Sequence, residues 1–452
     1  MDIEYVFHRF RRLVDEHCIP AAQLAVRHAG NTWEIEFGET EHRGGTPITR
    51  DSKIPIGSIT KTFTATLAMA LVSDGDLELD APLVDHLPDL RHAPRSLHSR
   101  LTLRHLLSHT GGLPSDAGDV RAASLQRHVA DCCRALEPVH LPGAGFSYSN
   151  VGYVLAGRLV EVVTGMSWWE AMHSILLAPL GISPGFVVGP ADAPGNGTPI
   201  VTGHAVNTVL ERVRPVHQSL AEAEAPAGAV AASAADLVAF GQLHVRDNAD
   251  PDRRAPRLMD RRAVLEMHRP VPDAEPFGMA DAWGLGLALY RDGTTTWVGH
   301  DGTGDGTACH LRINPESGTV VALTTSGSTG TAMWRALVDD FRRAGLPLAG
   351  YQGPPRRTRR TPPPPGCTGA YFNGGTEYLV APAHGREMQL TVDGESYGEL
   401  TTYEGLYFSM RDEDTGLDDH TGRFLTDPGT GRIGWIQVGG RLARRDRERV
   451  IA

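Results

Sequence analysis

The chain has few cysteines, no long apolar run and no excess of basic residues, and each shortage excludes a class of protein. Its 452 residues contain five cysteines, an odd number without the paired spacing of a metal site. No apolar stretch approaches the roughly 20 residues that a membrane-spanning helix needs. The formal net charge of -11 argues against general binding to nucleic acid. We therefore expect no membrane, nucleic-acid or metal partner, and the dispersed histidines agree with that expectation.

The first residues also lack the pattern of a secretory signal. Asp2 and Glu4 stand where such a signal carries basic residues followed by an apolar run. Together with the low number of cysteines, this start predicts a cytoplasmic protein. The hydrophobic content of 41% and the charged content of 21% are typical of a soluble globular protein with room for two or three domains.

Hydrophobic periodicity predicts an α/β unit with strands at both ends and a helical region between them. Alternating residues indicate half-buried strands, whereas apolar residues three and four positions apart indicate helices. Residues from about 80 to 285 are expected to be mainly helical. The result is an antiparallel sheet flanked by terminal helices, with a large helical region inserted. The predicted elements are a helix over 5–16, strands over 21–28 and 32–38, a helix from Ser58 to about Gly75, strands over 295–298, 308–313 and 319–325, and a helix over 331–344.

Composition changes sharply near residue 351. Residues 351–366 are rich in proline and arginine, which predicts a stiff, extended linker. Short strands separated by turns follow, and they predict a small, lipocalin-like β-barrel. We thus expect a domain over 1–350, a linker over 351–366 and a barrel over 367–452. The predicted barrel strands are 377–380, 388–392, 400–403, 406–410, 423–425 and 433–438.

The motif richest in chemistry is Ser58-Ile59-Thr60-Lys61, where a turn containing glycine enters an apolar helix. A helix places side chains three apart on one face, so Ser58 and Lys61 become neighbours. That pairing suits a nucleophile and the amine that activates it. The pattern is common by chance, however, and a helix N-terminus with a surface lysine explains it equally well.

Two further motifs follow. Tyr148-Ser149-Asn150 precedes an apolar helix, and His300-Asp301-Gly302-Thr303 stands at the end of a predicted strand. A lysine nearby could stabilise a tyrosine phenolate, and an asparagine amide can orient a substrate. Taken singly, the first is also explained as a helix cap with a packing tyrosine. The second is also explained as a strand-terminal turn or a loose cation-binding loop.

In this order, the three motifs resemble those of the serine β-lactamase and penicillin-binding-protein superfamily: Ser-x-x-Lys on a helix, Tyr-x-Asn, and Lys/His-x-Gly on a strand. The stretch from Leu103 to Pro114 resembles its class-C-like branch. His105 and His109 within it are interpreted as structural rather than as a metal pair. The resemblance covers about residues 5–345 and implies the β-lactamase/transpeptidase-like fold.

The resemblance also implies a role for each matching residue. Ser58 is expected to be the acyl-accepting nucleophile, held with Tyr148 in a network by Lys61. Tyr148 would act as general base and then as general acid, and Asn150 would orient the substrate. The backbone N–H groups of Ser58 and Thr303 would form the oxyanion hole.

The third motif departs from the Lys-Thr-Gly of β-lactamases. His300, followed by Gly302, would anchor a substrate carboxylate more weakly than lysine. This departure favours the esterases, D-aminopeptidases, amidases and transacylases of the branch. None of these implied roles calls for a cofactor.

The two-domain layout most resembles penicillin-binding-protein-type thioesterases, which cyclise peptides made by nonribosomal synthetases. The resemblance implies that Ser58 takes a peptidyl group, with a D-residue at the acyl end, from a phosphopantetheine thioester on a peptidyl carrier protein. The peptide's own amine then closes a macrolactam. Two alternatives stay open: a cytoplasmic esterase, D-stereospecific aminopeptidase or amidase, and a non-catalytic acyl-peptide binding protein.

Basic residues late in the chain suggest how substrate or partner is recognised. Arg441 follows the last predicted strand, where it could clamp a carboxylate with two hydrogen bonds. The other arginines suggest either a solvated linker and tail or a docking surface for an acidic carrier protein. They are Arg356, Arg357, Arg359, Arg360, Arg444, Arg445, Arg447 and Arg449.

Overall fold

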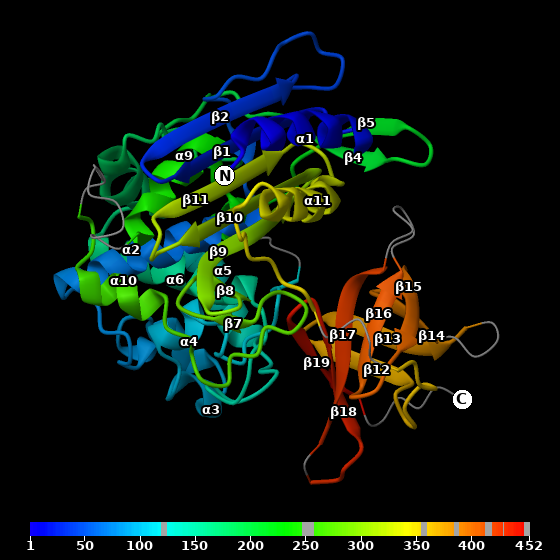
Figure 1. Cartoon of the computed structure of the whole chain (residues 1–452). Coiled ribbons are helices and arrows are strands. Elements are labelled where there is room, and N and C mark those ends of the chain that lie inside the picture. The colour runs from blue at the N-terminus through cyan, green and yellow to red at the C-terminus, as the bar shows by residue number, and fades with distance from the viewer. Residues whose placement is uncertain are drawn as a thin grey trace.

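The computed structural model describes residues 1–118, 124–245, 257–353, 359–383, 388–411, 418–427 and 429–446. They form an α/β body, which ends near residue 350, and a barrel beside it (Figure 1). Arg356, Arg357, Arg447 and Arg449, four of the arginines considered for docking, lie outside the described residues.

A seven-stranded antiparallel sheet organises the body, in the order β2-β1-β11-β10-β9-β8-β7. Successive residues of β1 face opposite sides, so Leu24 and Val26 join one hydrophobic core while Ala21 and Ala25 join the other. The sheet thus separates two cores. Its strands are β1 (Ala21–His28), β2 (Asn31–Gly38), β7 (Ala282–Trp283), β8 (Ala288–Asp292), β9 (Thr295–Gly304), β10 (Thr307–Asn314) and β11 (Thr319–Thr325).

Helices α1 (Ile3–Glu16) and α11 (Gly330–Arg343) pack together on one face of the sheet, as the amphipathic patterns predict. A buried carboxylate joins them, because Asp340 accepts hydrogen bonds from Tyr5 Oη and Arg9 Nε, both at 2.8 Å. The helical region covers the other face. Its helices are α2 (Thr60–Asp74), α3 (Arg95–His98), α4 (Leu103–Leu107), α5 (Leu125–Ala135), α6 (Asn150–Thr164), α7 (Trp168–Ala171), α8 (Ala225–Gly228), α9 (Ala234–Gly241) and α10 (Arg261–Met267).

The region expected to be mainly helical also holds short strands. β6 (Ala231–Ala232) pairs with β3 (Ile54–Pro55), which comes before that region, and β4 (Gly203–Asn207) forms a hairpin with β5 (Arg212–Val216). These pieces are too short to show a clear period in the sequence.

Strand β9 is longer than predicted. The expected strand over 295–298 continues to Gly304, so the motif from His300 to Thr303 lies inside a strand and not at a strand-terminal turn. Three glycines in this segment lower its apparent strand propensity. Pairing with β10 along the segment restores the extended conformation, and the sequence alone does not reveal that pairing.

The barrel is closed by eight antiparallel strands, two more than predicted. The prediction missed its first and last strands, which pair with each other. Arg441 therefore begins the last strand instead of following it. The prediction missed this strand because its arginine-rich sequence resembles a solvated tail. The strands are β12 (Gly369–Asn373), β13 (Thr376–Pro382), β14 (Met388–Val392), β15 (Glu395–Thr402), β16 (Tyr407–Arg411), β17 (Asp418–Thr426), β18 (Ile433–Val438) and β19 (Arg441–Arg445).

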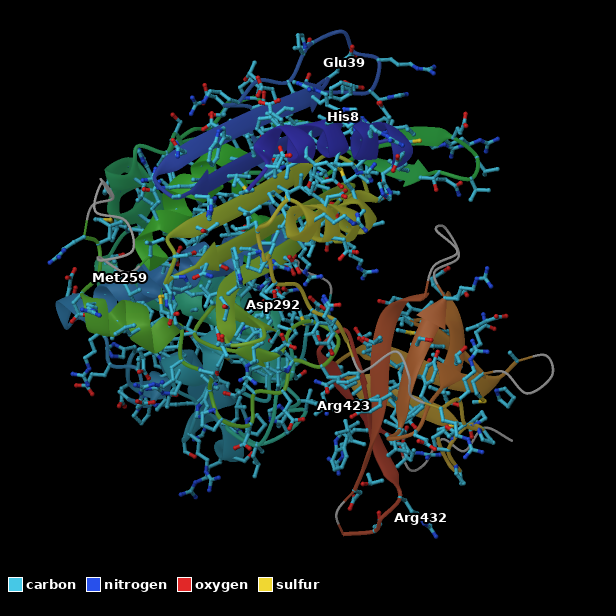
Figure 2. All side chains as sticks on the ribbon, viewed as in Figure 1. His8, Glu39, Met259, Asp292, Arg423 and Arg432 are labelled. Atoms are coloured by element: carbon cyan, nitrogen blue, oxygen red, sulfur yellow. The ribbon has the colours of Figure 1, made fainter. Side chains whose placement is uncertain are left out.

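Specific contacts hold the barrel against the body. Arg423, labelled in Figure 2 at the junction, donates to Glu275 Oε2 at 2.8 Å. The rings of Phe277 and Tyr407 stack with their centroids 5.2 Å apart. Asn373, which is 1% exposed, lies in the junction and bonds to the body on one side and to the barrel on the other. These contacts give the barrel a defined position against the body.

Candidate active site

Ser58 lies on a 3-10 turn, η1 (Gly57–Ile59), that leads into α2. The turn packs directly on β9, and Gly57 is required there: its φ is +51°, and an added Cβ would lie 2.3 Å from the Thr303 carbonyl oxygen. Helix α2 is buried along most of its length in the larger core. Ser58 therefore lies just before the N-terminus of a buried central helix.

Lys61 points from the first turn of α2 to Ser58. Its Nζ donates to Ser58 Oγ at 3.1 Å and to the Ala227 carbonyl at 2.8 Å, and the residue is 1% exposed. The alternative of a surface lysine is therefore wrong. Burial, and then the positive charge of Arg441, lower the pKa of Lys61 to about 7. A substantial fraction of the amine is thus neutral near pH 7 and able to accept the Ser58 proton.

Tyr148 lies beside this pair and is 3% exposed. Its ring centroid is 5.1 Å from Lys61 Nζ and 4.3 Å from the centre of the His109 ring. Burial raises the pKa of Tyr148, although Ser58 and Arg441 act in the opposite direction. The resting phenol is therefore protonated. This arrangement favours Lys61 over Tyr148 as the first base, and proton donation by Tyr148 to a leaving group stays a prediction.

The third motif meets the first through close backbone contacts. A Cβ on Gly302 would lie 2.0 Å from the Ile56 carbonyl oxygen, so only glycine fits there. This approach places Thr303 beside the turn that carries Ser58. The structure thus brings together the two residues whose N–H groups were predicted to form an oxyanion hole.

His300 faces the same centre from β9. It is 1% exposed, and its ring centroid lies 6.1 Å from that of Tyr148. Burial, followed by the charge of Lys61, lowers the pKa of His300 to about 4. The imidazole is consequently neutral near pH 7 and supplies no positive charge to anchor a carboxylate.

Asn150 begins α6, capped by the Ser149 side chain. Its Nδ2 donates to Asp116 Oδ1 at 2.6 Å. Sequence reasoning missed Asp116, because a single acidic residue after a Gly-Gly-Leu-Pro turn carries no recognisable pattern. It also missed His109 as the residue behind Tyr148: His109 Nδ1 accepts from the Ser149 N–H at 3.0 Å, which supports its structural interpretation.

Arg441 reaches the site from the barrel. Its guanidinium carbon lies 5.3 Å from the Tyr148 ring centroid. The placement follows from the preceding turn, where the Gly440 carbonyl accepts from the Tyr148 N–H at 3.0 Å. We call Ser58, Lys61 and Tyr148 the centre, and Asp116 and Arg441 the rim. The predicted carboxylate clamp by Arg441 is compatible with this position and stays a prediction.

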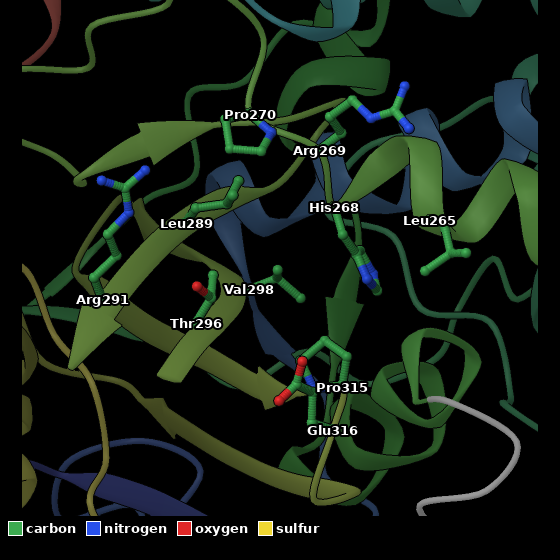
Figure 3. Close-up of a pocket in the computed structure, with 10 residues that line it drawn as sticks. All are labelled: Leu265, His268, Arg269, Pro270, Leu289, Arg291, Thr296, Val298, Pro315 and Glu316. Atoms are coloured by element: carbon green, nitrogen blue, oxygen red, sulfur yellow. The ribbon is translucent and has the colours of Figure 1, made fainter. Parts of the chain in front are cut away.

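Other features lie away from the centre. A surface pocket of about 320 Å³, lined by His268, Arg291 and Glu316 among others, contains none of the motif residues (Figure 3). Within the described ranges, no group of three or more histidine, cysteine or acidic side chains is arranged to hold a metal ion. Nor does any helix in that part of the chain have the length and apolar character to cross a membrane.

Comparisons with known proteins relate both the sequence and the fold to one family. The sequence model of the beta-lactamase family matches residues 6–344. Penicillin-binding protein 4 of Amycolatopsis lactamdurans is 34% identical over 351 residues, which cover 76% of this chain and 90% of that protein. Unguisins hydrolase ungD' of Aspergillus campestris is 26% identical, over 73% of this chain and 63% of its own length.

Among solved structures, that of SurE matches with a TM-score of 0.85 and 38% identity, covering 98% of both chains. A second structure of SurE, with D-Leu, matches with a TM-score of 0.80 and 36% identity over 98% of this chain and 99% of that one. These matches include the barrel, which the family model leaves out. The predicted fold class, a β-lactamase-like body followed by a small closed barrel, is confirmed.

Proposed function

The chain belongs to the beta-lactamase family, and from that membership we propose that it is a serine acyltransferase that releases a peptide by cyclising it. In this reaction Ser58 takes a peptidyl group, with a D-residue at the acyl end, from a thioester on a peptidyl carrier protein. The peptide's own amine then displaces Ser58 to close a macrolactam. The family comprises serine hydrolases and acyltransferases, so the proposal concerns the donor and the acceptor.

One observation carries the proposal: the likeness to SurE extends over body and barrel alike, so the whole two-domain layout is shared, and this is the layout that resembles the penicillin-binding-protein-type thioesterases. The barrel matters because it delivers Arg441 to the centre. The D-Leu in the second SurE structure supports a D-residue at the acyl end. The neutral imidazole of His300 agrees with a thioester donor, since such a donor has no carboxylate next to the reacting carbonyl.

The first step follows from the resting geometry. Neutral Lys61 takes the Ser58 proton as Oγ attacks the thioester carbonyl carbon. The Ser58 and Thr303 N–H groups donate hydrogen bonds to the carbonyl oxygen, on which negative charge develops. Protonation of the departing thiolate, assigned to Lys61 or Tyr148, completes the acyl-enzyme. The amine of the peptide then attacks the ester and regenerates Ser58.

A hydrolase is the second candidate, because the match to unguisins hydrolase ungD' supports water as an acceptor. Mass spectrometry separates the two. The protein is incubated with short peptidyl thioesters that end in a D- or an L-residue, and both the adduct and the released product are weighed. A cyclic product from the D-terminated thioester is expected. A linear acid alone would favour the hydrolase, and failure to form any adduct would revive the non-catalytic binding protein.

A further inference from the structure

Asp116 projects from a backbone segment that both domains hold in place. The Ser115 N–H donates to Asn373 Oδ1 of the barrel at 2.6 Å, and the Ser115 carbonyl accepts from the Asn150 N–H at 2.7 Å. Ser115 Oγ adds a bond to the Tyr148 carbonyl at 3.0 Å. Three bonds to neighbouring elements thus fix the residue that precedes Asp116, and the carboxylate leaves this segment at a defined point of the rim.

The Asp116 side chain is exposed, yet it is oriented. Its Oδ1 accepts from Asn150 Nδ2 at 2.6 Å, and Asp116 forms no ion pair within the part of the chain that the structure describes. Among the described residues, no hydrogen-bond donor contacts the second carboxylate oxygen, so a ligand that donates hydrogen bonds can reach it there. Since Asn150 is predicted to orient the acyl group, the Asp116 carboxylate is joined through Oδ1 to the residue that would hold the acyl group.

Charges of both signs act on the centre. Asp116 raises the pKa of Lys61, whereas Arg441 lowers it, and the same two residues act in opposite directions on Tyr148. Glu224, which is half-buried, raises the pKa of Lys61 in the same direction as Asp116. A peptide esterified to Ser58 has lost its carboxylate, so the ionisable group at its free end is an amine. The negative charges of Asp116 and Glu224 match that amine.

We propose that Asp116 binds the N-terminal amine of the acyl-peptide and directs it at the ester on Ser58. The inference rests on the proposed function and names the residue that selects the acceptor. One N–H of the amine donates to the free Asp116 oxygen while the nitrogen forms a bond to the ester carbon. The bond from that carbon to Ser58 Oγ breaks, and Oγ takes up a proton. Overall, ester and ammonium give amide, serine hydroxyl and one proton.

Asp116→Asn tests the proposal, because the new side chain keeps an oxygen for Asn150 but removes the charge. The probes are three forms of one D-terminated peptidyl thioester, with a free N-terminal amine, a hydroxyl in its place, or an acetylated amine. Glu222→Gln is the matched control, since it removes an exposed carboxylate from the 3-10 turn that also contains Glu224. Ring closure and hydrolysis are measured separately for each form.

We expect Asp116→Asn to slow ring closure of the amine form about tenfold or more, since it loses a charge-assisted hydrogen bond. The hydroxyl form and the hydrolysis of the acetylated form should change less than about twofold, as should all three in Glu222→Gln. Equal losses with all three forms would overturn the proposal, because Asp116 would then act only by orienting Asn150. No loss with any form would overturn it as well.

Failure of the proposed function gives a different result. If the unaltered protein acylates Ser58 but forms no ring from the amine or hydroxyl form, cyclisation itself is wrong, whatever the variants do. If it forms the ring and Asp116→Asn forms it equally well, only the role of Asp116 is wrong.

Discussion

The centre and the rim of this site differ in burial and in origin. Lys61 and Tyr148 are almost completely enclosed, and both come from the helical region of the body. Asp116 is exposed, and Arg441 is half-buried and comes from the barrel. Burial shifts the pKa values of the centre far from their usual range, whereas the rim residues act on it through their charge. We expect the buried residues of the centre to be needed for the reaction of every substrate. We expect the more exposed residues of the rim to affect some substrates more than others, and the predictions below test this division.

Ser58→Ala should have the largest effect. It removes the nucleophile, so acylation should fall by at least about 10³-fold with peptidyl thioesters and small activated esters alike. The fold should persist, because alanine is smaller than serine and no side-chain capping bond is made at this turn or at the start of α2. Intact-protein mass spectrometry and a thermal melt measure the two quantities. Turnover of either substrate at the original rate would contradict the assignment of the centre.

Lys61→Met should reduce acylation to a similar degree. It should also reveal how far the buried amine lowers the free energy of unfolding. The pKa of Lys61 falls from 10.5 to about 7 on folding. Between these values the unfolded chain binds a proton that the folded chain does not, so stability rises with pH. Below about pH 7 both states are protonated and the destabilisation is complete. Denaturant titrations at pH 7 and pH 9.5 should show this gain for the unaltered protein, and Lys61→Met should lack it.

The acylation rate of the unaltered protein should likewise rise with pH through about 7, as Lys61 loses its proton. This profile is measured with an ester that has no ionisable group. A flat profile between pH 5.5 and 8.5 would contradict Lys61 as the base.

Tyr148→Phe should slow acyl transfer by about 10²- to 10⁴-fold, the usual contribution of a general acid or base. Tyr153→Phe is the matched control. Tyr153 is equally buried, but its hydroxyl donates to the Leu107 carbonyl at 3.0 Å, away from Ser58. The control should lose about 1 kcal/mol of stability and keep its activity. Equal activity losses in the two variants would indicate a packing role for Tyr148.

Arg441→Ala should have a smaller and more selective effect. We expect a loss of about tenfold with peptidyl thioesters and little change with a small activated ester. Because Arg441 lowers the pKa of Lys61, its removal should also move the acid limb of the pH profile to higher pH. Arg444→Ala, an exposed position on the same strand, is the control and should leave both measurements unchanged. An unshifted profile would show that rim and centre are electrostatically independent.

Asn373→Ala should have the smallest effect on chemistry. It leaves the buried Ser115 N–H without an acceptor, which should cost about 1–3 kcal/mol of stability. The ring-closed fraction of product should fall a few-fold, because Asp116 and Arg441 lose their common support. Thermal melts and product analysis check both expectations. An unchanged product ratio would show that the rim does not need this contact.

The division between centre and rim also decides what could be predicted from the sequence. Ser58 and Lys61 are neighbours through helix geometry alone, so a local pattern is enough to find them. Tyr148 and His300 were found because they stand in recognisable motifs, although the protonated state of the tyrosine depends on burial. Asp116 has no motif, and its position depends on contacts with a barrel residue far along the chain.

The fold divides in the same way. Strands β1, β11, β14 and β18 end where the periodic pattern predicts, because local alternation defines them. The C-terminal part of β9 and the whole of β12 and β19 were not predicted, because these strand segments depend on their pairing partners. Glycine in β9 and arginine in β19 conceal strands that neighbouring strands stabilise, and no local pattern reports those neighbours.

The bond between the Tyr148 N–H and the Gly440 carbonyl has a consequence for synthesis of the protein. The two residues are separated by almost three hundred positions, and domains generally fold in order as the chain emerges, at about 5–20 residues per second. The body is complete near residue 350, about 90 residues before Arg441, so a newly made body would hold its nucleophile and lysine for roughly 5 to 20 seconds without the strand that supplies Arg441. The active site is therefore completed late in synthesis. A chain interrupted before β19 would carry Ser58 and Lys61 but lack Arg441.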